Sequence, residues 1–122
     1  MRILGIDYGM SKIGLAIADG KMAIPFKIIK ETDLNKQLEL VEEVINAENI
    51  DLVVIGLPMS LKQNRTDQTE HTEKFIKSLE EKNIKIVTAD ERLSSKAAQS
   101  LGIKEDDAVA AMQILQTYID RH

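Results

Sequence analysis

The strongest constraint on the fold lies in the first twenty residues, where two apolar runs flank a short polar turn. The runs cover 3–6 and 13–18, and the turn between them carries Gly9. Each run has the length of a β-strand, and so short a connection favours a hairpin. The first run ends in Asp7, and a carboxylate at the end of a buried strand is costly unless it is paired, hydrogen-bonded or bound to a metal. Asp7 is therefore the first residue to consider for function.

The rest of the chain predicts one more consecutive strand and then strands that alternate with helices. The third strand is expected over Ala23–Lys30, and its Pro25 suits an edge position because proline cannot donate to a strand ladder. Three consecutive strands followed by this alternation indicate an α/β fold with a five-stranded mixed sheet, antiparallel at one edge and parallel beyond it, with helices on both faces. The later elements expected are a helix capped by Thr32 or Asp33, a buried strand within 51–58, a helix from Asp67 to Lys82-Asn83, a strand over 84–89, a short helix from Ser94 or Ser95 to Gly102, and a helix over Asp106–Asp120.

Length and composition limit the classes of protein to consider. A chain of 122 residues predicts a single domain, 1–122, with one core. The absence of cysteine excludes disulfides and thiolate zinc sites, and no apolar stretch approaches the roughly 20 residues that span a bilayer. We expect a cytoplasmic protein without a membrane partner. The net charge of −4 argues against a protein that coats nucleic acid non-specifically, but not against an enzyme whose carboxylates hold cations.

Acidic residues from three segments are predicted to meet at one edge of the sheet. Asp7 ends the first strand, Asp90 and Glu91 follow the fifth, and Asp107 begins the last helix on its apolar side. Carboxylates brought together stay ionised only if cations lie among them, and an all-oxygen set favours Mg²⁺ or Mn²⁺. Two such ions about 4 Å apart suit phosphodiester hydrolysis.

Each acid also has a purely structural explanation, which spacing alone leaves open. Asp7 could bond to amides of the following turn, and Asp107 could serve only as a helix N-cap. Asp90, Glu91 and Arg92 could form a surface cluster of ion pairs.

Four stretches of the chain together resemble the YqgF (RuvX) nucleases, relatives of Holliday junction resolvases with a ribonuclease H-like fold. They are ILGIDYGMSKIGLAIAD, VVIGLP, ADERLSS and DAVAAMQILQTYID, which occur in the family's order and span nearly the full chain. The resemblance implies that Asp7, Glu91 and Asp107 are the catalytic acids and that they bind Mg²⁺ or Mn²⁺, with two ions expected. Asp90 lies in the same motif as Glu91 and is a candidate fourth ligand.

The resemblance also implies a substrate, a nucleic acid cut at a phosphodiester bond. The usual description of the family is a nuclease that matures the 5′ end of pre-16S ribosomal RNA, which makes the ribosome or an assembly factor a candidate partner. Resolution of four-way DNA junctions is the competing proposal. The residues do not indicate an oligomeric state.

Four basic residues are candidates for contact with nucleic acid. Lys12 could reach a phosphate beside Asp7, and Arg92 could hold one with two hydrogen bonds. Lys62 and Arg65 lie in a loop at the same end of the sheet. A solvated turn explains Lys12 as readily, and the structural alternatives, a solvated loop for Lys62 and Arg65 and an ion pair for Arg92, are favoured over contact with nucleic acid.

The sequence departs from the family pattern just before the last helix, and this keeps other functions open. The longer segment rich in lysine and arginine that is common there is reduced to GIKEDD at 102–107. A non-catalytic module that binds RNA or assembling ribosomes is therefore an alternative. A third class, the ATP-binding proteins of the sugar kinase, actin and Hsp70 type, begins with a similar strand and turn. It needs two such lobes, and 122 residues supply only one.

Overall fold

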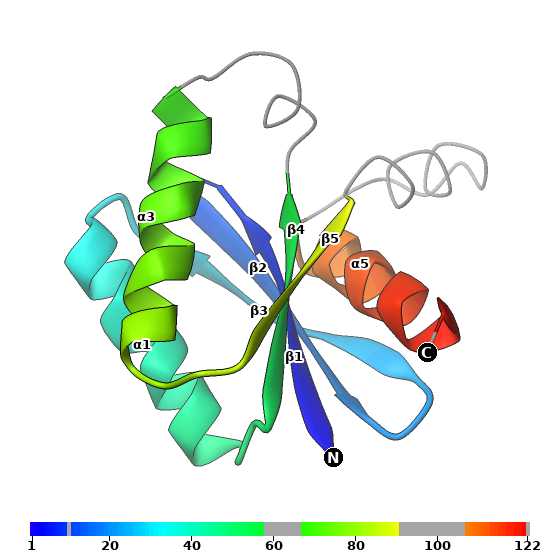
Figure 1. Cartoon of the computed structure of the whole chain (residues 1–122). Helices are drawn as coiled ribbons and strands as arrows, with labels where there is room; N and C mark the ends of the chain where they lie inside the picture. The colour runs from blue at the N-terminus through cyan, green and yellow to red at the C-terminus, as the bar shows by residue number, and fades with distance from the viewer. Residues whose placement is uncertain (10, 58–66, 91–106, 122) are drawn as a thin grey trace.

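The computed structural model describes residues 1–9, 11–57, 67–90 and 107–121, which form one sheet with helices on both sides (Figure 1). The strand order is β3-β2-β1-β4-β5. β1 pairs antiparallel with β2 and parallel with β4, β2 pairs antiparallel with β3, and β4 pairs parallel with β5. The predicted mixed sheet is thus confirmed. The elements are β1 Arg2–Tyr8, β2 Lys12–Asp19, β3 Ala23–Lys30, α1 Leu34–Ala47, β4 Leu52–Leu57, α3 Asp67–Glu81, β5 Ile86–Asp90 and α5 Asp107–Arg121.

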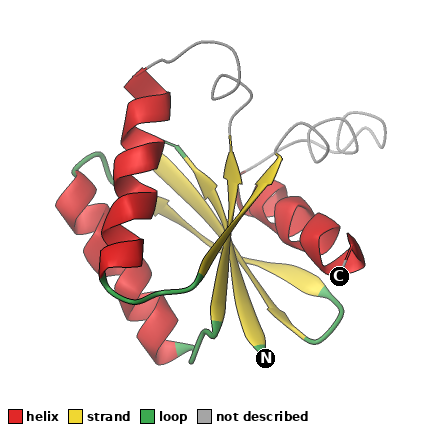
Figure 2. Cartoon of the chain, in the orientation of Figure 1, coloured by secondary structure: helices red, strands yellow, loops and turns green. Residues whose placement is uncertain are grey.

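The two faces of the sheet are covered by different helices. α1 and α3 lie on one face and α5 crosses the other (Figure 2). Along β1, Leu4, Ile6 and Tyr8 join the core beneath α1 and α3, whereas Ile3 joins the core beneath α5. This alternation follows from the period of two in a strand, and it places Gly5 and Asp7 on the α5 face.

Several local predictions are confirmed by the backbone. Asp33 is the N-cap of α1 and accepts a hydrogen bond of 3.1 Å from the amide of Lys36. Asn83 follows α3 with a φ of 64°, the left-handed conformation typical of a residue that ends a helix. Pro25 lies in the edge strand β3, as predicted. The short helix expected between Ser94 or Ser95 and Gly102 falls outside the described residues, and no helix among those described is long and apolar enough to cross a membrane.

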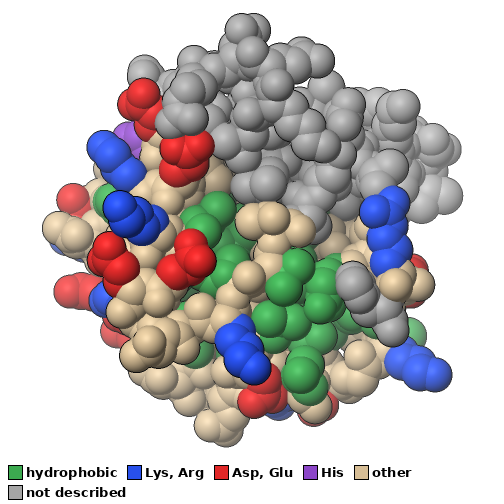
Figure 3. Space-filling view, in the orientation of Figure 1, with side chains coloured by type: hydrophobic (Ala, Val, Ile, Leu, Met, Phe, Trp, Pro, Cys, Tyr) green, Lys and Arg blue, Asp and Glu red, His purple; other side chains and the backbone are tan. Residues whose placement is uncertain are grey.

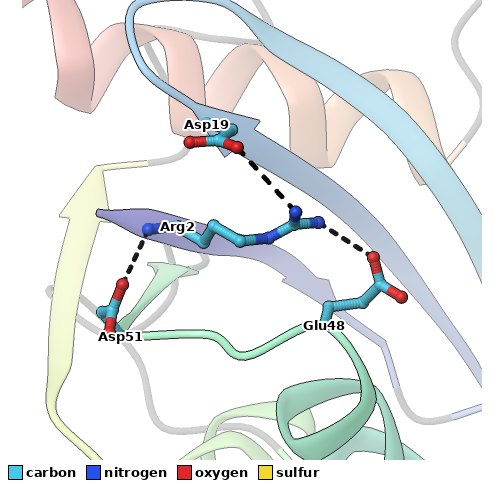
Figure 4. Close-up of polar contacts among 4 residues, drawn as sticks. All are labelled: Arg2, Asp19, Glu48 and Asp51. Carbon is cyan, nitrogen blue, oxygen red and sulfur yellow. Dashed lines mark hydrogen bonds and ion pairs between the residues drawn. The ribbon is translucent and has the colours of Figure 1, made fainter.

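Arg2 fastens the end of β1 that lies away from Asp7 (Figure 4). Its guanidinium is 2.9 Å from the carboxylate of Glu48 and 3.8 Å from that of Asp19. Its backbone amide donates to the side chain of Asp51, whose own amide donates to the carbonyl of Arg2, each over 2.8 Å. These contacts join β1 to β2 and to the connection that leads into β4.

Candidate metal and nucleic-acid site

Asp7 lies near the carboxyl end of the central strand β1, between two glycines. Its register partners are Gly14 on β2 and Gly56 on β4. Because both partners are glycines, no side chain of β2 or β4 lies directly beside this carboxylate in its row. Asp7 itself is half-buried.

The helix α5 packs closely against this part of the sheet. A Cβ atom added to Gly5 would lie 2.8 Å from the Cβ of Leu115, and one added to Gly56 would collide with Cδ1 of Ile114. A side chain at Gly5 would meet atoms fixed to the helix backbone, and a side chain at Gly56 would require the end of Ile114 to move. Gly5 and Gly56 therefore let α5 approach the backbone of β1 and β4 close to Asp7.

The direction of α5 brings its first residue to the same end of the sheet as Asp7. Near its C-terminal end, Gln116 accepts a hydrogen bond of 2.8 Å from the amide of Ala23 and donates one of 3.0 Å to the carbonyl of Lys21, at the opposite end of the sheet. Its middle, at Leu115 and the preceding turn, contacts Gly5. The helix start at Asp107 consequently lies toward the carboxyl end of β1 (Figure 1).

β5 delivers its last residue to the same edge. Gly56 pairs with Ala89 on one side and with Asp7 on the other, and the next pair along is Leu57 with Asp90. Since β1, β4 and β5 are parallel, their carboxyl ends meet at one edge. Glu91 follows Asp90 directly in the sequence and lies outside the described residues.

The predicted site residues are described to different extents. Asp7 and Lys12 are described with their side chains, and Lys12 is exposed at the start of β2. Asp90 and Asp107 are described by their backbone positions as the end of β5 and the start of α5. Glu91, Arg92, Lys62 and Arg65 are not among the residues described. Within the described set no three acidic or histidine side chains form a metal cluster, so the site remains a prediction that the backbone geometry supports.

Tyr8 contributes packing beneath the site. Its ring lies 4.6 Å from that of Phe75, between centroids, and its hydroxyl is 2.8 Å from Oε1 of Gln37. Burial raises the pKa of Tyr8 to about 12. The nitrogen of the Gln37 amide in turn donates to the carbonyl of Glu31 over 2.6 Å.

Sequence reasoning missed this role of Gln37, although a signal was present. Gln37 interrupts the apolar stripe of α1, because it lies three residues after Leu34 and four before Val41. A polar residue on a buried stripe requires a partner. The partner proves to be Tyr8, the residue next to Asp7.

Comparison with known proteins identifies the family of this chain. The family model described as "RuvX: Holliday junction resolvase" matches residues 1–121. The chain belongs to the RuvX family. A RuvX relative from Ruminiclostridium cellulolyticum, named "Putative pre-16S rRNA nuclease", is 40% identical and aligns over 99% of this chain and 95% of its own length. A protein of the same name from Endomicrobium trichonymphae is 34% identical over 98% of this chain and 95% of its own length.

Solved structures place this RuvX chain in the fold of the junction resolvases. Thermus thermophilus RuvC in complex with a Holliday junction substrate matches with a TM-score of 0.65 at 18% identity, over 96% of this chain and 91% of RuvC. The fowlpox virus resolvase, in complex with Holliday junction DNA, gives a TM-score of 0.63 at 15% identity, over 99% and 98% of the two chains. The ribonuclease H-like fold expected from the sequence is thereby confirmed.

The alignment with the Ruminiclostridium relative also shows that this RuvX chain is short. It extends over 135 positions, whereas the chain has 122 residues, so at least 13 positions have no counterpart here.

Charged side chains of both signs are mixed over the left of the molecule, where α1 and α3 lie (Figure 3). No single sign dominates that side in this view. The side of α1 and α3 seen in this view therefore shows no concentration of positive charge among the described residues, of the kind that binds a phosphate backbone.

Proposed function

We propose that this chain is a divalent-metal-dependent endonuclease that hydrolyses phosphodiester bonds, with the precursor of 16S ribosomal RNA as its substrate. The family and the names of the relatives support this class of activity. The observation that carries the proposal is the position of Asp7, which lies between two glycines at the edge where β5 ends and α5 begins. On this account the protein acts in the cytoplasm, where the assembling ribosome is its partner.

Three acids from three elements would hold the metal. Asp7 comes from β1, Asp107 from the start of α5, and Glu91 from the segment after β5, with Asp90 as a further candidate. Carboxylates match the preference of Mg²⁺ and Mn²⁺ for oxygen ligands, and the chain has no cysteine to favour a softer metal. Two bound ions about 4 Å apart would activate a water molecule and stabilise the leaving oxygen.

The chain's own residues would position the substrate around these acids. Gly14 and Gly56, the register partners of Asp7, place no side chain next to its carboxylate, while Ile114 of α5 packs against Gly56. Lys12 lies two residues before Gly14 on β2 and therefore on the same face of the sheet. Its ammonium can pair there with a phosphate. Arg92, Lys62 and Arg65 are further candidates for this role.

A second candidate function is the resolution of four-way DNA junctions, which the description of the family favours. The same acids would cut the same type of bond, so the metal site cannot distinguish the two substrates. The chain is shorter than its alignment with the Ruminiclostridium relative. This keeps a third candidate function open, a binding module without catalysis. That function would not require the Asp7 carboxylate.

The test uses the purified protein, Mn²⁺ or Mg²⁺, and two end-labelled substrates, a pre-ribosomal RNA leader and a mobile four-way DNA junction. Asp7→Asn and a chelator are compared with the wild type on each substrate. Asp19→Asn is the matched control, because it removes the same charge from the exposed far end of β2. Cleavage of the RNA that both Asp7→Asn and the chelator abolish, while Asp19→Asn retains it, supports the proposal.

The other outcomes select among the alternatives. Preferential cutting of the junction with the same dependence on Asp7 favours the resolvase. Activity that survives Asp7→Asn contradicts the assigned site, and absence of metal-dependent cleavage on both substrates favours the binding module.

A further inference from the structure

The face of the sheet that carries Asp7 continues across β2 to the edge strand β3. Asp7 pairs with Gly14, and Gly14 pairs with Ile28 on β3, so these three residues form one row across three strands. The next row toward the carboxyl end of β1 contains Lys12 opposite Lys30. Ile29, between Ile28 and Lys30, belongs to the core beneath α1 and α3, which places its two neighbours on the α5 face.

This part of the α5 face is open because α5 contacts the other end of β3. Gln116 binds the backbone at Lys21 and Ala23, where β3 begins. Toward the other end of the strand, Ile28 is 37% exposed and Phe26 is 40% exposed. Phe26 is also the extra residue of β3 at a register shift, since Leu15 pairs with Lys27 and Ala16 with Pro25.

The two lysines of this surface face each other without a compensating acid. Like charges directly opposite in an antiparallel pair destabilise a sheet. Among the residues that the structure describes, neither Lys12 nor Lys30 forms an ion pair, although the chain has more acids than bases. Such a pair is expected where an anionic ligand neutralises both charges.

Protection of the sheet edge does not account for this arrangement. A lysine on an edge strand discourages pairing with another chain, and this could explain Lys30. It does not explain Lys12, which lies on β2 inside the sheet, or the exposed apolar side chains of Phe26 and Ile28 on the edge itself. Lysines beside exposed aromatic and apolar groups are instead typical of surfaces that bind single-stranded nucleic acid.

We propose that Lys12, Lys30, Ile28 and Phe26, here called the edge-strand surface, bind the nucleic acid strand that leads away from the bond held at Asp7. The lysines would pair with its phosphates, and the two apolar side chains would contact its sugars and bases. Ile28 lies two strand spacings from Asp7, or about 10 Å, which corresponds to about three nucleotides at the rise of one strand of a duplex. This inference rests on the proposed function, because Asp7 marks the position of the reacting bond.

The test measures the dissociation constant of the full-length protein for a labelled single-stranded RNA leader, in chelator, between 50 and 300 mM salt. We expect Lys30→Gln to weaken binding by about 3- to 10-fold at 0.1 M salt and to reduce the slope of log K against log salt by about 0.7 to 1. Phe26→Ala should also weaken binding but leave the slope unchanged, since it removes no charge. Lys85→Gln is the matched control, an exposed lysine just before β5 at the opposite end of the sheet.

The outcomes separate this inference from the proposed nuclease activity. If Lys30→Gln binds RNA with the affinity and salt slope of Lys85→Gln, the inference is wrong, even where Asp7→Asn abolishes cleavage. If Lys30→Gln or Phe26→Ala changes the sedimentation coefficient of the free protein and not its affinity for RNA, the edge-strand surface is a protein contact and the inference is also wrong. If the lysine effect is present while Asp7→Asn still cleaves, the edge-strand surface binds RNA, but both the assigned active site and the path of the strand from Asp7 are wrong. Thermal unfolding of each variant confirms that it is folded.

Discussion

The hydroxyl of Tyr8 lies 2.8 Å from Oε1 of Gln37, and this hydrogen bond joins the residue after Asp7 to the first turns of α1. The amide nitrogen of Gln37 extends the connection to the carbonyl of Glu31 at the end of β3. The end of β1 that carries Asp7 is therefore held by a polar network on the face of the sheet opposite α5. Loss of this network should loosen the end of β1.

Tyr8→Phe should destabilise the protein, because it leaves the buried oxygen of Gln37 without this donor. The expected loss in the free energy of unfolding is about 1 to 3 kcal/mol. Urea denaturation of the wild type, Tyr8→Phe, Gln37→Leu and the double variant measures the coupling between the two residues. Additive effects in this cycle would show that the hydrogen bond contributes nothing of its own.

The raised pKa of Tyr8 predicts a loss of stability in alkali. The folded protein holds the phenol proton up to a pKa of about 12, whereas the unfolded chain releases it near the ordinary value of 10.0. The stabilisation is therefore complete below pH 10 and is lost as the pH rises toward 12. The difference in unfolding free energy between the wild type and Tyr8→Phe, measured from pH 8 to 12, should decrease across that window. A difference that stays constant would contradict the assignment.

The glycines beside α5 should differ in how well they tolerate alanine. At Gly56 the added Cβ would meet the end of the flexible Ile114 side chain, which can move, so the expected cost is about 1 to 3 kcal/mol. At Gly5 it would meet the Cβ of Leu115 and, at 3.0 Å, the carbonyl oxygen of Ala111, neither of which can move without the helix. Gly5→Ala should therefore be the more destabilising variant in thermal unfolding.

A second substitution distinguishes these two contacts. Ile114→Val removes the Cδ1 atom with which a Cβ at Gly56 would collide, so it should restore part of the stability lost in Gly56→Ala. Leu115→Ala retains its Cβ and should not rescue Gly5→Ala. Equal rescue in both pairs would mean that the close approach of α5 is not what requires the glycines.

Replacement of Arg2 should affect stability without affecting the candidate site. Arg2→Met removes the ion pairs with Glu48 and Asp19 at the end of β1 away from Asp7 (Figure 4). Because these groups are partly exposed, the expected cost is at most about 1 kcal/mol, and it should shrink at high salt. Urea denaturation at 0.05 and 1 M salt measures it. Unchanged metal-dependent cleavage would show that the two ends of β1 act independently.

Much of the fold was predictable because its signals are local. The apolar runs predicted β1 and β2, Pro25 indicated the edge position of β3, and Asp33 was one of two expected caps of α1. The register shift opposite Phe26 and the contact of Gly56 with Ile114 were not predicted. Both depend on pairing between distant segments, which local patterns do not specify.

The candidate site was predictable to a smaller extent. Strand order and helix direction explain why Asp7 and the start of α5 share one edge. The sequence predicted that the acids meet at the carboxyl ends of parallel strands, but not the strand order or the direction of the helix. The choice of Glu91 as the third acid came only from the family resemblance, because Asp90 and Glu91 both follow an apolar strand. The role of Gln37 was not predicted, because its hydrogen bond with Tyr8, 29 residues away in the sequence, depends on how α1 packs on the sheet.

Binding of Mn²⁺ measured by isothermal titration, without substrate, tests the metal site most directly. The account predicts that the wild type and Asp19→Asn bind Mn²⁺ with the same affinity and that Asp7→Asn binds it at least about tenfold more weakly. Mn²⁺ should likewise raise the thermal unfolding midpoint of the first two proteins more than that of Asp7→Asn. Equal Mn²⁺ affinity in the wild type and Asp7→Asn would contradict the claim that Asp7 holds a metal.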